Sequence, residues 1–204
     1  MTFRELDHYR NRGAAQYLGV ISSEGAAAGA AWPEGTGKRV FAYLHGAYRD
    51  MDKLLSLVNT LGCRALIFAP GMAPAIEEKF RSSRLSFSRQ PLAISEVARQ
   101  CDLAICHGGP ATTTAFLRAG CALLLLPTHL EQYLLSLNVE SLGAGLLINP
   151  EIPNTDTAGV LRRLLKESSF KARAMDFAER YSDYDPGRVL QDIVTRCEEI
   201  IAGA

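Results

Sequence analysis

Short apolar runs alternate with amphipathic segments from residue 39 to residue 148. Apolar runs bounded by turn-forming residues indicate strands, and apolar residues at a spacing of three or four indicate helices. We predict strands at 39–44, 64–68, 85–88, 103–106, 122–126 and 145–148, and helices at about 50–61, 73–81, 93–100, 111–119 and 131–142. This alternation at short intervals predicts the α/β class, a Rossmann-like, doubly wound parallel sheet with helices on both faces.

Two regions lie outside this alternation. Residues 1–37 show no sustained periodicity and become rich in Gly and Ala, so we interpret them as a linker-like N-terminal segment that precedes a domain over 38–204. Beyond about residue 155 the chain is helical, and its apolar positions recur at helical spacing as far as Ile201. We expect most of this tail to face the core.

The stretch 101–120 carries the most distinctive chemistry. An apolar strand runs into His107, Gly108 and Gly109, and a helical pattern follows. A strand that turns through glycines into a helix aims the free N–H groups of that helix at the space beyond the strand end, as in phosphate-binding turns. Pro110 suits the first helical position, which makes Gly109 the N-cap. A purely structural tight turn is the alternative.

Several side chains around this turn are candidates for contact with a diphosphate. Three hydroxyls follow in the first turn of the helix, those of Thr112, Thr113 and Thr114. The imidazole of His107 is expected to donate a hydrogen bond where charge grows on a leaving diphosphate. His45 and Gly46 end the first strand, which is a neighbour of the fourth in a Rossmann strand order, so both loops would face one crevice. His45 could instead cap a neighbouring loop.

Composition narrows the function classes. Lys plus Arg and Asp plus Glu number 22 each, so no net field favours nucleic acid or an anionic membrane, and an anion site must be local. The longest apolar run, 121–126, is too short to span a bilayer, and no signal-peptide core opens the chain, so we expect a cytoplasmic location. Five cysteines without a Cys-x-x-Cys pair indicate reduced thiols, with neither a disulfide framework nor a metal site.

The order of these motifs resembles the C-terminal, nucleotide-sugar-binding domain of family 1 glycosyltransferases, the GT-B enzymes built from two facing Rossmann-like domains. It covers about 38–150 and rests on His-Gly-Gly at 107–109, the Thr pair, Gly120, Pro127 and the pair Glu131-Gln132. The resemblance implies an inverting, metal-independent transfer of a sugar from a UDP- or dTDP-sugar to an acceptor hydroxyl, with no cofactor. The acceptor pocket and the general base would belong to an N-terminal domain absent from these residues. We therefore expect the chain alone to bind donor without transferring it, and to self-associate weakly.

The resemblance also implies roles for four further positions. Glu131 and Gln132 would reach sugar hydroxyls, although a carboxylate in the first turn of a helix is favourable for the helix dipole alone. Arg89 stands where plant members carry a tryptophan under the nucleotide base, and an arginine plane can also stack; a solvated surface arginine is the alternative. Ala115 departs from the pattern, because family members usually place there a Glu that holds the ribose hydroxyls.

Three functions remain open on this basis. The first is the donor-binding half of a glycosyltransferase. The second is a non-catalytic sugar-nucleotide-binding module, which Ala115 favours because a methyl group accepts no hydrogen bond. The third is a nucleotide-sugar epimerase of the same two-domain architecture, which the order of the Thr pair and the Glu-Gln pair fits less well. The sugar, the base and the acceptor stay open.

Overall fold

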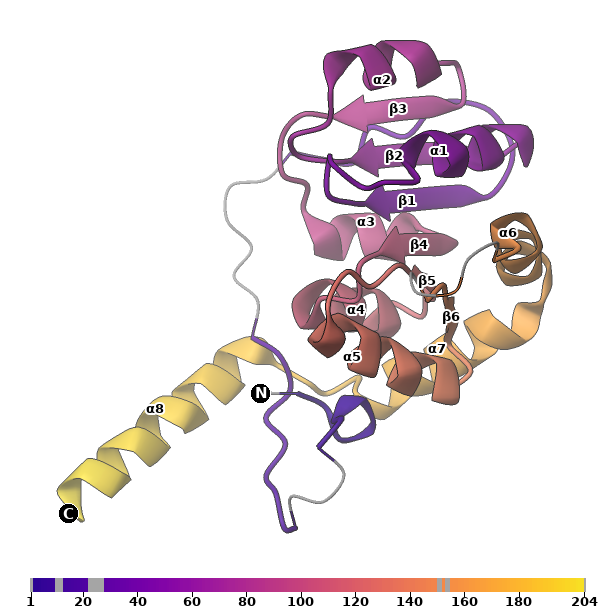
Figure 1. Cartoon of the computed structure of the whole chain (residues 1–204). Helices are drawn as coiled ribbons and strands as arrows, with labels where there is room; N and C mark the ends of the chain where they lie inside the picture. The colour runs from indigo at the N-terminus through magenta and orange to yellow at the C-terminus, as the bar shows by residue number, and fades with distance from the viewer. Residues whose placement is uncertain (1, 10–12, 22–27, 150–151, 153–154, 204) are drawn as a thin grey trace.

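One parallel sheet organises the chain. The computed structural model describes residues 2–9, 13–21, 28–149, 152 and 155–203. Six strands lie in the order β3-β2-β1-β4-β5-β6, which is the Rossmann order and confirms the predicted class (Figure 1). The strands are β1 (Arg39–Tyr43), β2 (Arg64–Phe68), β3 (Leu85–Ser88), β4 (Leu103–Cys106), β5 (Ala122–Leu125) and β6 (Gly145–Leu147). The predicted bounds agree with these to within one residue.

Helices cover both faces of this sheet. A short 3-10 turn, η1 (Arg4–Leu6), precedes α1 (Met51–Thr60), α2 (Pro74–Phe80), α3 (Ile94–Gln100), α4 (Pro110–Arg118), α5 (Leu130–Ser141), α6 (Thr157–Lys166), α7 (Ser168–Arg180) and α8 (Pro186–Ala202). One core cluster joins the sheet to α3, α4, α5 and most of α7, and a second joins it to α1, α2 and α6. Among the described residues, no helix combines the length and the apolar composition needed to cross a membrane.

Side chains of each strand alternate between the two clusters. In β1, Phe41 enters the cluster of α3, α4 and α5, while Val40 and Ala42 enter the cluster of α1 and α6. Every residue of β4 and β5 is buried. Strands buried on both faces read as continuous apolar runs, which is why these strands were predictable from the sequence.

The N-terminal segment packs against the domain more closely than a linker would. Phe3 and Leu6 are buried in the core, and the ring centroid of Phe3 lies 4.4 Å from that of Tyr181. The side-chain amide of Asn138 donates to the carbonyl of Leu6 at 3.2 Å. Two buried side chains separated by polar residues create no periodic pattern, so their burial could not be predicted from the sequence. Residues 1, 10–12 and 22–27 of the predicted segment lie outside the described residues.

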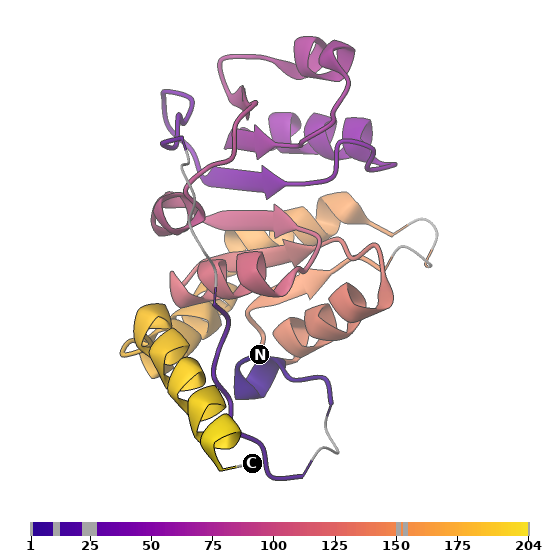
Figure 2. The same cartoon turned by 90° about the vertical axis from the view of Figure 1, so that its left-hand side faces the viewer.

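The exposure of the last helix, α8, differs from the prediction that most of the tail faces the core. In α6 and α7 the predicted burial holds, since Leu161, Leu164 and Phe170 are buried. None of the described side chains of α8 is buried, and the helix extends away from the sheet and the other helices (Figures 1 and 2). Its exposed apolar side chains include Leu190, Val194, Ile200 and Ile201. Helical spacing shows that a helix has an apolar face, but not that the chain holds the surface that covers it.

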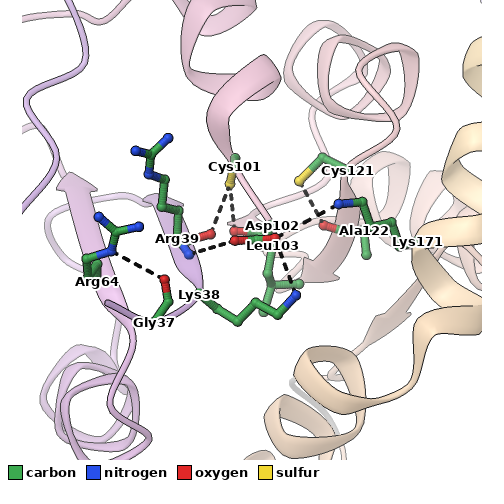
Figure 3. Close-up of polar contacts among 10 residues, drawn as sticks. All are labelled: Gly37, Lys38, Arg39, Arg64, Cys101, Asp102, Leu103, Cys121, Ala122 and Lys171. Carbon is green, nitrogen blue, oxygen red and sulfur yellow. Dashed lines mark hydrogen bonds and ion pairs between the residues drawn. The ribbon is translucent and has the colours of Figure 1, made fainter. Parts of the chain in front are cut away.

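A polar network ties the sheet together at the edge where its strands begin (Figure 3). The carboxylate of Asp102 accepts a hydrogen bond from the backbone N–H of Arg39 at 2.9 Å. It also pairs with the ammonium groups of Lys38 at 3.4 Å and Lys171 at 4.0 Å. The network joins the starts of β1 and β4 to α7, and it lies at the opposite edge from the ends of the strands.

The five cysteines form no disulfide in the structure. Burial raises the pKa of Cys106 to about 11, so this thiol stays protonated near neutral pH. Four of the five are buried, namely Cys63, Cys101, Cys106 and Cys121, while Cys197 is exposed on α8.

Candidate functional site

The ends of β1 and β4 form one crevice. The two strands pair in parallel with Tyr43 opposite Cys106, so the loops that follow them start side by side. A pocket of about 220 Å³ lies between these loops. Its lining residues are Tyr43, Leu44, His45, Pro70, Cys106, His107, Gly109, Thr112 and Gln132. The prediction that the two loops converge at the topological switch point is confirmed.

The two glycines of the turn, Gly108 and Gly109, differ in backbone conformation and in the space around them. Gly108 has a φ of +87°, and a Cβ there would lie 2.7 Å from Oγ of Ser136, so only glycine fits. Gly109 is the N-cap of α4, as predicted, with an ordinary φ of −66°. A Cβ on Gly109 would meet no heavy atom within 4 Å, so open space lies in front of the helix start. The N–H groups of Ala111 and Thr112, in the first turn, have no partner within the helix.

Only one of the three threonines presents its side chain to the pocket. Thr112 lines it, whereas Thr113 is fully buried. The hydroxyl of Thr114 donates to the carbonyl of Pro110 at 2.8 Å, within the helix. Consecutive residues of an α-helix point about 100° apart, so three in a row cannot share one face. The hydroxyls of Thr113 and Thr114 therefore do not point into the pocket, contrary to the prediction.

Both ring nitrogens of His107 have protein partners. Nδ1 lies 2.7 Å from the carbonyl oxygen of Leu126, and Nε2 lies 2.8 Å from the backbone nitrogen of His45. A carbonyl only accepts and an N–H only donates, so the hydrogen sits on Nδ1 and Nε2 accepts. In this structure the ring thus has no hydrogen left for a phosphate, unlike the predicted donor. Instead it joins the loops that follow β1, β4 and β5.

The surroundings of His107 favour this neutral ring. Burial lowers its pKa, and the nearby His45 and His129 lower it further, while the hydrogen bond to the Leu126 carbonyl raises it. Because burial is the largest of these effects, the pKa lies below the ordinary value of 6.5. His107 is therefore uncharged at neutral pH.

This lowered pKa predicts a loss of stability in acid. The unfolded chain takes up the proton of His107 near pH 6.5, above the lowered pKa of the folded state. The contribution of the neutral His107 ring to the free energy of unfolding is therefore present above pH 6.5. It is lost as the pH falls from 6.5 toward the pKa of His107 in the folded state. Urea unfolding between pH 8 and pH 5 measures this. His107→Gln keeps one donor and one acceptor without titrating, so its unfolding free energy should fall less; an equal fall in both proteins would contradict the prediction.

The loop after β1 contributes in two ways. The ring of His45 is exposed beside the pocket, with its centroid 6.0 Å from that of His107. Gly46 instead packs against the loop after β2. Its N–H donates to the carbonyl of Pro70 at 3.0 Å, and a Cβ there would lie 2.1 Å from the backbone nitrogen of Met72. Close contact between two backbones accounts for the glycine at this position.

Several known glycosyltransferases are similar to this chain in sequence or in structure. No protein-family model matches it. A "PGL/p-HBAD biosynthesis glycosyltransferase" of Mycobacterium tuberculosis is 33% identical over 78 residues, which cover 38% of this chain and 18% of that protein. A "Sterol 3-beta-glucosyltransferase" of Vanderwaltozyma polyspora is 28% identical over 79 residues, which cover 39% of this chain and 6% of that protein.

Solved structures extend the similarity over nearly the whole chain. The spinosyn rhamnosyltransferase SpnG, complexed with thymidine diphosphate, superposes with a TM-score of 0.73 at 20% identity, over 93% of this chain and 54% of that one. The glycosyltransferase SnogD from Streptomyces nogalater superposes with a TM-score of 0.70 at 20% identity, over 91% of this chain and 52% of that one. This chain has the fold of one half of a GT-B glycosyltransferase. It spans about half the length of these structures and less of the curated relatives.

In this GT-B half, the predicted sugar contacts lie at the start of α5. Gln132 lines the pocket, and its side-chain oxygen accepts hydrogen bonds from the N–H and the hydroxyl of Thr128 at 2.9 and 3.0 Å. Glu131 is exposed in the first turn of the same helix and does not line the pocket. Contact of this pair with sugar hydroxyls stays a prediction.

Two positions suggested by the GT-B resemblance lie outside the pocket. Arg89 follows β3, and its guanidinium pairs with the carboxylate of Glu77 on α2 at 3.2 Å. Ala115 lines a separate hollow beside Arg99 and Arg118, and its side chain offers no acceptor. Glu77 was not among the residues predicted from the sequence, because nothing in its own helix distinguishes it from other surface carboxylates.

Other lining residues also escaped prediction. Tyr43 and Cys106 are the last residues of their strands, and Pro70 follows β2, so their position at the strand ends was the available signal. Tyr48 places its ring centroid 5.8 Å from that of His107 and lines a second hollow of about 700 Å³, which His45 also lines. In the described part of the chain, no group of three or more His, Cys, Asp or Glu side chains is placed to hold a metal ion.

Proposed function

We propose that this chain is the donor-binding half of a glycosyltransferase that moves a sugar from a nucleotide diphosphate sugar to an acceptor hydroxyl. The observation that carries the proposal is the open space before the start of α4, which Gly109 leaves at the topological switch point. Helix N-termini with unpaired N–H groups bind phosphate groups well. The glycosyltransferase relatives, and the neighbour solved with thymidine diphosphate, support the same ligand class.

In this proposal backbone groups hold the diphosphate. The N–H groups of Ala111 and Thr112 donate to its oxygens, and the Thr112 hydroxyl adds a third donor. The helix terminus adds about 0.3–1 kcal/mol. As the nucleotide leaves, its negative charge grows, and donors already in place stabilise that charge more than they stabilise the bound substrate. The proposed reaction is inverting and needs no metal ion.

His107 then acts as a positioning residue. Its neutral ring joins the loops after β1 and β5 to the turn before α4 through two hydrogen bonds, of 2.8 and 2.7 Å. The ring thereby fixes the shape of the pocket without touching phosphate through an N–H. Gln132, Glu131 and Arg89 complete the proposed donor site on either side. The acceptor pocket and the general base belong, in this proposal, to the other half of the enzyme.

A non-catalytic nucleotide-sugar-binding module is the second candidate. The observation that favours it is Ala115, which supplies no acceptor for ribose hydroxyls. Both candidates bind nucleotide at α4, but only the first supports transfer when the chain is combined with an acceptor-binding half.

Binding of nucleotide without a metal ion tests both candidates. We expect UDP or dTDP, titrated into the chain in EDTA, to bind saturably and to shift the amide NMR signals of Gly109, Ala111 and Thr112. Gly109 and Thr112 line the pocket, and the N–H of Ala111 lies in the first turn of α4. Added Mg²⁺ should leave the affinity unchanged. Calorimetry gives the affinity.

Two matched threonine variants sharpen this test. Thr112→Val removes a hydroxyl at the pocket and should weaken binding about tenfold, since one hydrogen bond to a charged group is lost. Thr114→Val removes a hydroxyl that bonds within the helix and should leave the affinity unchanged. Unshifted amides at saturating UDP and dTDP would refute the proposed site.

A further inference from the structure

Glu77 is a buried carboxylate that the proposed diphosphate site does not use. The residue is 7% exposed and lies on α2. Two arginines reach it, Arg81 from the C-cap of the same helix and Arg89 from the chain that follows β3. Arg89 approaches with one edge, placing Nε 3.2 Å from one carboxylate oxygen and a terminal nitrogen 3.4 Å from the other. Such a two-point fork fixes the plane of a guanidinium as well as its position.

The two arginines differ in what surrounds them. The guanidinium carbon of Arg81 lies 5.8 Å from the centroid of the Phe87 ring, so an aromatic ring of the protein already lies beside it. The side chain of Arg89 is 77% exposed, although its edge is engaged with Glu77. An exposed guanidinium that is held by its edge presents a flat face, and such a face stacks on planar rings.

Sheet topology places Arg89 on the same edge as the diphosphate site. The strands β3, β2, β1 and β4 are neighbours and all run parallel, so their ends face the same side (Figure 1). Arg89 directly follows β3, and the turn at Gly109 follows β4. Three strand spacings of about 4.8 Å separate these ends, roughly 14 Å in all. A nucleotide whose diphosphate lies at α4 can therefore extend its base toward β3.

We propose that Glu77 is a positioning residue for recognition of the nucleotide base: it holds the Arg89 guanidinium by its edge so that the flat face stacks on the base. The inference rests on the proposed nucleotide site. A free arginine side chain samples many rotamers, and ordering it on binding costs free energy. The fork orders Arg89 before the nucleotide arrives, so Glu77 strengthens binding of the base without touching it.

The test compares a ligand with a base to a ligand without one. UDP and inorganic diphosphate are titrated into the full chain and into Glu77→Gln, Arg89→Lys and Arg81→Lys. Glu77→Gln removes the charge of the fork, and Arg89→Lys removes the planar face while keeping the charge. Each should weaken UDP roughly five- to tenfold and leave inorganic diphosphate unchanged. Arg81→Lys, which alters the other arginine on the same carboxylate, should change neither affinity.

Base stacking supplies a second readout. The ultraviolet absorption of the uracil ring should decrease when UDP binds to the wild-type chain, and this decrease should be smaller in Arg89→Lys and in Glu77→Gln. Thermal unfolding verifies that each variant is folded. If Glu77→Gln does not fold, the UDP affinity and the uracil absorption of Arg89→Lys decide the test.

The outcomes separate the two proposals. Equal weakening of UDP and inorganic diphosphate in Glu77→Gln would show a general structural role and overturn the inference. Unchanged UDP affinity in either Glu77→Gln or Arg89→Lys would overturn it as well. Failure of the wild-type chain to bind either ligand would refute the proposed nucleotide site itself, and the inference with it.

Discussion

Replacing Gly46 by alanine is expected to lower the free energy of unfolding by about 3 kcal/mol or more. The added Cβ would lie 2.1 Å from the backbone nitrogen of Met72 and 2.2 Å from the carbonyl carbon of Gly71. Both are backbone atoms, so no side chain can rotate away, and the loops after β1 and β2 must separate. Separation also breaks the hydrogen bond from the Gly46 N–H to the Pro70 carbonyl. Urea unfolding followed by circular dichroism measures the loss.

Gly109→Ala is the matched control, because its Cβ would meet no heavy atom within 4 Å and its φ is ordinary. We expect its stability to stay within about 1 kcal/mol of wild type, since alanine is only a poorer N-cap. Its affinity for UDP should fall nonetheless, because the methyl group enters the space proposed for the diphosphate. Near-wild-type stability of Gly46→Ala would show that the two loops are not held together as described.

The sequence predicted the sheet well because each strand is short, apolar and bounded by turns. Burial on both faces of β4 and β5 produces runs that no amphipathic helix would show. The start of α4 was predictable for a similar local reason. Pro110 and Gly109 fix the first helical residue and its cap without help from distant residues.

The candidate site was less predictable, because its geometry depends on contacts between distant residues. Nδ1 of His107 donates to the carbonyl of Leu126, 19 residues away, and Nε2 accepts from the N–H of His45, 62 residues away. No local pattern encodes either contact. The pairing of Arg89 with Glu77 likewise joins the end of β3 to α2 and needed the three-dimensional structure.

The two ends of the chain illustrate opposite errors. The N-terminal segment lacks periodicity, yet Phe3 and Leu6 are buried. Helix α8 has a strong helical pattern of apolar residues, yet none of its described side chains is buried. Burial thus depends on whether a complementary surface is available in the folded chain, and periodicity reports only on the segment itself.

Replacing His107 by alanine is expected to lower the free energy of unfolding by about 2–4 kcal/mol. The change leaves the Leu126 carbonyl and the His45 N–H without the partners that they have in the wild type. UDP affinity should fall too, because the loops around the pocket are no longer joined. His45→Ala should cost less than about 0.5 kcal/mol, since the side chain is exposed and the backbone N–H that contacts His107 remains. Urea unfolding and calorimetry measure the two effects.

The pattern of these losses distinguishes positioning from direct phosphate contact. If His107 acts by joining the loops, His107→Gln should recover part of both stability and UDP affinity, because an amide supplies one donor and one acceptor. A direct charged contact would instead require a proton on Nε2, and the buried ring resists that charge. UDP affinity in the wild type would then rise steeply as the pH falls. Such a rise, together with near-wild-type stability of His107→Ala, would contradict the positioning role and restore the donor role predicted from the sequence.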